Sequence, residues 1–92
     1  MKFTPEQRIE AYEYASDNLA LGRNYICNEL IRWVRKYTME KEVDFAADFP
    51  EFWAQRPKDA SYAWWPTNNE SYRQQRIGVL NKAIALAKLA TE

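Results

Sequence analysis

The sequence predicts an all-α fold, a compact bundle of three main helices with a short fourth helix and an aromatic-rich loop. Three long segments carry apolar residues at the spacing of one helix face, and capping signatures precede two of them. A strand would need a partner, and the chain has no second run of alternating apolar residues to supply one. Its 92 residues form a single helical domain, 1–92.

The first helix is predicted from about Pro5 to Leu21. It follows a capping signature, Thr4-Pro5-Glu6-Gln7, in which the threonine caps, the proline suits the first helical position and the glutamine completes a capping box. Apolar residues then recur at helical spacing up to Leu19. Gly22 stands where a left-handed residue commonly ends a helix.

The second helix is predicted to begin after a capping Asn24 and to end near Tyr37 or Thr38. Its apolar side chains form a broad face. Because the joint from Gly22 to Asn24 is so short, the first two helices are expected to be roughly antiparallel neighbours.

The middle of the chain is less regular. Phe45 and Phe49 stand four residues apart, which predicts one or two helical turns, and Pro50 interrupts or restarts the helix. The aromatic segment from Phe45 to Trp65 is expected to pack across the main helices, and residues 58–66 are expected to form its loop.

The last helix is predicted from about Asn69 to Ala90, after the capping signature Thr67-Asn68-Asn69-Glu70. It carries two adjoining apolar stripes, so it is either central to the fold or contacts another subunit in a homodimer. Gly78 lowers the helix propensity of this segment. We expect it to permit the close approach of a neighbouring helix or aromatic ring.

The composition excludes most catalytic chemistry. With no histidine and one cysteine, Cys27, the chain cannot assemble a Ser-His or Cys-His pair, and a transition-metal site is not expected. Its two glycines are isolated, so no phosphate-binding loop is present. We expect no enzyme activity and no cofactor. Cys27 is predicted to be a core residue.

The charge balance argues against two classes of partner. Thirteen basic residues face thirteen acidic ones, whereas proteins that bind duplex nucleic acid usually carry a basic excess. No apolar run is long enough to span a bilayer and no signal peptide is apparent, so we expect a cytoplasmic protein without a membrane partner. Charge is nevertheless uneven, with an acidic stretch at 38–51 and a basic one at 23–37.

Two groups of aromatic and basic residues are candidate binding sites. The first group is Trp64, Trp65, Tyr72, Arg73 and Arg76, in which the rings could stack on a ligand and the arginines could bind an anion near a helix start. Alternatively, these tryptophans clamp the loop onto the helices and the arginines are solvated.

The second group is Trp33, Arg32 and Arg35, together with Lys36. The alternative for this group is a solvated helix face with one tryptophan at its boundary.

Three segments resemble those of short accessory proteins of bacteriophages and prophages. They are Tyr25-Ile26-Cys27-Asn28-Glu29-Leu30, Trp64-Trp65-Pro66 and the end of an arginine-bearing helix, Leu80-Asn81-Lys82-Ala83-Ile84. The resemblance implies a small protein made inside an infected bacterium. Proteins of this kind often antagonise host defence, as anti-CRISPR proteins and proteins that sequester nucleotide signals do. No agreed activity accompanies the group, so no catalytic residue carries over.

Three functions follow as hypotheses. The first is a protein that inhibits a host complex by stoichiometric contact, since tryptophan, tyrosine and arginine dominate interface energetics. The second is an oligomeric sponge that sequesters a nucleotide. The third is a structural or regulatory phage protein that oligomerises through its last helix.

Overall fold

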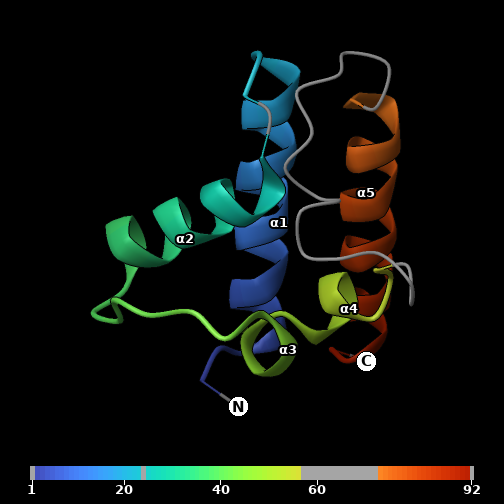
Figure 1. Ribbon diagram of the computed structural model, residues 1–92. Helices are drawn as coiled ribbons and strands as arrows, with labels where there is room; N and C mark the ends of the chain where they lie inside the picture. The colour runs from blue at the N-terminus through green and yellow to red at the C-terminus, as the bar shows by residue number, and fades with distance from the viewer. Residues whose placement is uncertain (1, 24, 57–72, 92) are drawn as a thin grey trace.

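The computed structural model describes residues 2–23, 25–56 and 73–91, and these form an all-α structure (Figure 1). Five helices are present in the described residues and no strand: α1 (Pro5–Ala20), α2 (Ile26–Tyr37), α3 (Phe45–Asp48), α4 (Pro50–Trp53) and α5 (Arg73–Leu89). The predicted fold class is confirmed. The aromatic loop at 58–66 and the capping signature at Thr67 lie outside the described residues. None of the described helices is long and apolar enough to cross a membrane.

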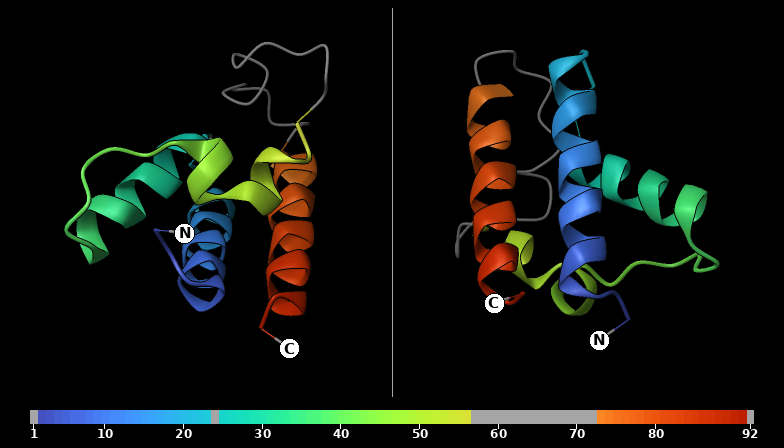
Figure 2. Two further views of the ribbon diagram at one scale, coloured as in Figure 1. Left: turned by 90° about the horizontal axis from the view of Figure 1, so that it is seen from below. Right: turned by 180° about the vertical axis from the view of Figure 1, so that it is seen from behind.

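Helix α1 occupies the centre of the fold. Helix α5 packs antiparallel along one flank of α1, while α2 crosses the opposite flank steeply (Figures 1 and 2). The prediction that the first two helices are roughly antiparallel is therefore wrong. A short joint fixes how near two helix ends lie, but ring packing sets their direction here. Trp33 of α2 packs edge-on against Phe3 at 5.9 Å, and Tyr37 packs against Tyr14 of α1 at 6.1 Å.

The predicted ends of α1 are confirmed to within one residue. The backbone N–H of Gln7 donates to Thr4 Oγ1 at 3.1 Å, and the backbone N–H of Thr4 donates to Gln7 Oε1 at 2.8 Å. These two hydrogen bonds complete the capping box. Gly22, just past the helix, has φ +108°, a conformation that glycine adopts without strain. At the start of α2 the N-cap position is taken by Tyr25, which makes no side-chain capping bond. The predicted cap, Asn24, lies outside the described residues.

Helices α3 and α4 bear out the predicted restart at Pro50. Asp44 caps α3 through the Ala47 amide, and Pro50 is the first residue of α4. The rings of Phe45, Phe49 and Phe52 are buried between these short helices and the body. In the described part of the aromatic segment, the phenylalanines thus belong to the core. Two carboxylates of the acidic stretch, Asp48 and Glu51, also turn inward.

Helix α5 presents a single buried stripe to α1, formed by Arg76, Leu80, Ala83 and Ala87. The stripe takes residues from both of the predicted apolar stripes. Gly78 is exposed, and apart from its chain neighbours and the backbone of its own helix, no atom of the described residues would lie within 4 Å of a Cβ added there. The predicted close approach at Gly78 is therefore absent from the described structure.

Candidate binding surface on helix α2

The first predicted group is only partly described. Trp64, Trp65 and Tyr72 lie outside the described residues, while Arg73 is half-buried at the start of α5. Arg76 is 2% exposed and lies in the stripe that faces α1. Because an interior side chain cannot contact a partner at the surface, neither a surface binding role nor a solvated position matches Arg76.

The second predicted group divides in two, because Trp33 is a core residue. Its side chain is 3% exposed, and its ring contacts Phe3 and Tyr37. The expectation that it borders the apolar face is wrong. A signal for its burial was present in the sequence, since Trp33 follows Ile26 by seven residues and Leu30 by three, which places all three on one helix face.

The two arginines of this group do come together at the surface. Arg32, Arg35 and Lys36 are exposed along one side of α2, around an open depression of about 550 Å³ that Asn28 and Ile31 complete. Arg35 Nε donates to the Lys41 carbonyl at 3.2 Å, so the segment that follows α2 is tied to its basic side. We call the surface formed by Arg32, Arg35 and Lys36 the α2 basic face.

Apolar side chains adjoin the α2 basic face. Met39 is 96% exposed and Tyr37 is largely exposed, and Met39 lines a second open depression of about 420 Å³ together with Arg35 and Lys41. The turn that carries Met39 is ordered by hydrogen bonds, from Thr38 Oγ1 to the Val34 carbonyl at 2.6 Å and from the Glu40 amide to Thr38 Oγ1 at 3.1 Å. Arginine, tyrosine and methionine are enriched in protein interfaces.

A buried carboxylate on α2 was not predicted. Glu29 is 2% exposed, and its Oε1 accepts no hydrogen bond in the described structure. The nearest cation is Arg32, whose Nη1 lies 3.6 Å from that oxygen. Its position held a signal, since Glu29 follows Ile26 by three residues and precedes Trp33 by four, on the edge of the buried face.

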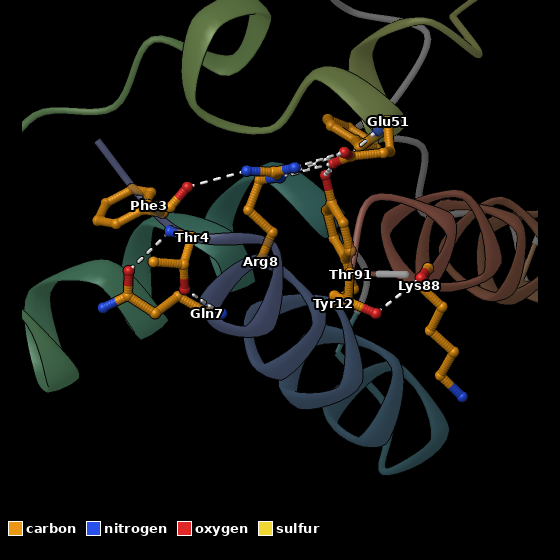
Figure 3. Close-up of polar contacts among 9 residues, drawn as sticks. Phe3, Thr4, Gln7, Arg8, Tyr12, Glu51, Lys88 and Thr91 are labelled. Atoms are coloured by element: carbon orange, nitrogen blue, oxygen red, sulfur yellow. Dashed lines mark hydrogen bonds and ion pairs between the residues drawn. The ribbon is translucent and has the colours of Figure 1, made fainter. Parts of the chain in front are cut away.

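A second buried polar cluster joins α1 to α4, and Figure 3 shows its contacts. Arg8, 3% exposed, donates from Nε and Nη2 to the two oxygens of Glu51 at 2.9 Å each, and from Nη1 to the Phe3 carbonyl at 2.9 Å. The Tyr12 hydroxyl donates to Glu51 Oε1 at 2.9 Å and accepts from the Phe52 amide at 3.4 Å. We call Arg8, Tyr12 and Glu51 the α1–α4 lock.

The lock shifts the pKa values of Glu51 and Tyr12 in opposite directions. Burial alone would raise the pKa of Glu51, but hydrogen bonds from Arg8 and Tyr12 outweigh it and hold that pKa below its ordinary value. Burial, and then the charge of Glu51, raise the pKa of the Tyr12 hydroxyl far above its usual range. Tyr12 is therefore a poor proton donor to any external group. We interpret the α1–α4 lock as a structural cluster.

The described residues offer little else for chemistry. Cys27 is buried and forms no disulfide, as predicted for a core cysteine. No group of three or more histidine, cysteine, aspartate or glutamate side chains in the described ranges is placed to hold a metal ion. No protein-family model, curated protein or solved structure matches the chain. The surface of α2 is thus the observation that bears most on function.

Proposed function

We propose that the chain is a non-catalytic binding protein that covers an acidic surface of a partner protein with the α2 basic face. The observation that carries this proposal is the gathering of Arg32, Arg35 and Lys36 beside exposed Met39 and Tyr37. Helix α2 also stands out from the α1–α5 pair, so a partner can approach it (Figure 2).

The chemistry of these side chains favours protein as the partner. An arginine guanidinium pairs with a carboxylate through two parallel hydrogen bonds, and arginine and tyrosine are frequent hot spots of interfaces. The chain as a whole has no net charge, so attraction would come from this face alone. Binding of this kind is expected to weaken as salt is added, because exposed charges are screened.

The biological setting is taken from the resemblance to phage accessory proteins. In that setting the partner is a protein complex of the host bacterium, and stoichiometric contact blocks its defence activity, as anti-CRISPR proteins do. The place of action would be the host cytoplasm.

Charge reversal tests the proposal. Wild type, Arg32→Glu/Arg35→Glu and the control Lys82→Glu/Lys88→Glu are immobilised, and captured proteins from a bacterial lysate are identified by mass spectrometry. The control makes the same change of net charge at exposed positions on α5. We expect wild type and control to capture the same protein and the α2 variant to lose at least about tenfold of it.

The captured protein is then purified and its affinity measured at low and high salt. Equal capture by all three chains, or by none, would refute the proposed role of the α2 basic face.

A further inference from the structure

Helix α1 carries a row of four exposed carboxylates that the proposed contact through the α2 basic face does not use. They recur every three or four positions, so their side chains share one side of the helix: Glu6, Glu10, Glu13 and Asp17. The other charged residue of α1, Arg8, is buried in the α1–α4 lock. We call the four carboxylates the α1 acidic stripe.

The described part of the chain does not neutralise the α1 acidic stripe. None of the ion pairs in the described ranges involves its carboxylates. Like charges that lie three or four residues apart on a helix repel one another. Because this repulsion is not compensated within the described structure, a cationic surface from outside the chain would be attracted to the stripe.

Aromatic side chains adjoin the stripe where α2 crosses α1. An open depression of about 310 Å³ lies there, lined by Glu10, Glu13, Tyr14, Asp17, Trp33 and Tyr37. The rings of Tyr14 and Tyr37 lie at 80° to each other, with centroids 6.1 Å apart. An arginine guanidinium can stack on a tyrosine ring and also pair with a carboxylate. The depression therefore suits a basic side chain that a partner surface inserts.

The α2 basic face adjoins this depression on the same molecule. Tyr37 lines the depression, and Lys36 Nζ lies 5.4 Å from the centroid of its ring. No ion pair of the described residues joins the stripe to the basic face within one chain. A two-fold rotation about an axis near Tyr37 would instead place each surface opposite its complement on a second copy. Tyr37, which is 58% exposed, would then be covered at the centre of the contact.

We propose that the chain forms a two-fold symmetric dimer in which the α1 acidic stripe of each copy contacts the α2 basic face of the other. The charges are complementary, with four carboxylates opposite Arg32, Arg35 and Lys36. The chain has no net charge, so overall repulsion does not oppose the pairing of two copies. The dimer covers the surface that the proposed function assigns to a partner protein. If that function holds, the partner and the second copy compete for the α2 basic face.

Analytical ultracentrifugation at low salt, over a range of concentrations, tests the dimer, and a charge exchange tests which surfaces form it. Glu13→Lys/Asp17→Lys reverses two charges of the stripe, and Arg35→Glu/Lys36→Glu reverses two charges of the basic face. Each variant alone should dimerise at least about tenfold more weakly than wild type, because attractive pairs become repulsive. An equimolar mixture should recover the dimer, because both contacts are complementary again. Thermal unfolding confirms that each variant folds.

The mixture needs a control for simple attraction between oppositely charged chains. The chain has net charge zero and each replacement changes it by two, so the first variant carries +4 and the second −4. Lys82→Glu/Lys88→Glu also carries −4, but it changes exposed positions on α5 and keeps both surfaces. It should dimerise as wild type does. It should bind Glu13→Lys/Asp17→Lys at least about tenfold more weakly than Arg35→Glu/Lys36→Glu does.

Three results would overturn the dimer: a wild type that stays monomeric up to about 1 mM, single variants that dimerise as tightly as wild type, or a mixture that does not associate. A monomeric wild type would leave the stripe to a basic partner protein or to solvent. These measurements use the purified chain alone, so their result does not depend on the proposed protein contact. In the capture experiment, Glu13→Lys/Asp17→Lys keeps the α2 basic face and should capture more partner than wild type. Equal or weaker capture would contradict the competition.

Discussion

Among the described residues, Glu29 is buried and Glu51 is largely buried, and the surroundings of these two glutamates differ. Glu51, in the α1–α4 lock, receives hydrogen bonds on both oxygens from Arg8 and another from Tyr12. Glu29, on α2, has an oxygen with no donor and one cation at 3.6 Å. A buried charge that receives hydrogen bonds from the chain contributes to one fixed structure, whereas a buried charge without donors lowers stability.

The two regions also differ in how they are assembled. The lock joins residues 43 positions apart and holds α4 against the centre of the fold (Figure 3). Glu29 and Arg32 are neighbours on a single helix, three residues apart. The lock therefore depends on tertiary structure, while the Glu29 pair is local and adds no connection between helices.

Breaking the lock should have the largest effect on stability. Arg8→Ala leaves the largely buried Glu51 without its main partner, and we expect the free energy of unfolding to fall by about 3–5 kcal/mol. Urea denaturation followed by circular dichroism measures it. Lys82→Ala, an exposed change on α5, should alter stability by less than about 0.5 kcal/mol. A loss below about 1 kcal/mol for Arg8→Ala would mean that the lock is not a main support of the fold.

The second largest effect on stability is expected from acid, which weakens the lock by protonating Glu51. The pKa of Glu51 is lower in the folded chain than its ordinary value of 4.5, so its ionised form stabilises the fold above that pH. This contribution is lost as the pH falls below about 4.5 towards the folded-state pKa. The melting temperature of wild type should therefore drop more steeply below that pH than that of Glu51→Gln. Parallel acid profiles would show that other carboxylates control acid unfolding.

Much of the fold could be predicted because its signals are local. A capping box at Thr4 and Gln7, a glycine after α1 and a proline at position 50 each act within a few residues, and each is found where it was expected. The steep crossing of α2 over α1 depends on which rings meet across the interface. Sequence spacing does not encode that choice, so the antiparallel prediction was wrong.

The candidate site was predictable in part for the same reason. Arg32 and Arg35 share a helix face by spacing alone, and they are exposed there. Trp33 and Arg76 were taken for surface residues because tryptophan and arginine are common in binding sites. Their spacing from Leu30 and Leu80 instead places them on buried stripes, and helical periodicity was the better guide. Glu29 was passed over because a glutamate on an apolar face is uncommon.

The prediction with the smallest expected effect compares the Glu29–Arg32 pair directly with the Arg8–Glu51 pair. A double-mutant cycle on Glu29→Gln and Arg32→Ala should give a coupling energy below about 1 kcal/mol, since the two groups lie beyond hydrogen-bond distance and Arg32 is half exposed. The same cycle on Arg8→Ala and Glu51→Gln should give several times more. Glu29→Gln alone should leave the free energy of unfolding unchanged or raise it, because the substitution removes a poorly paired buried charge. A loss above about 2 kcal/mol in Glu29→Gln would instead make Glu29 a second structural carboxylate.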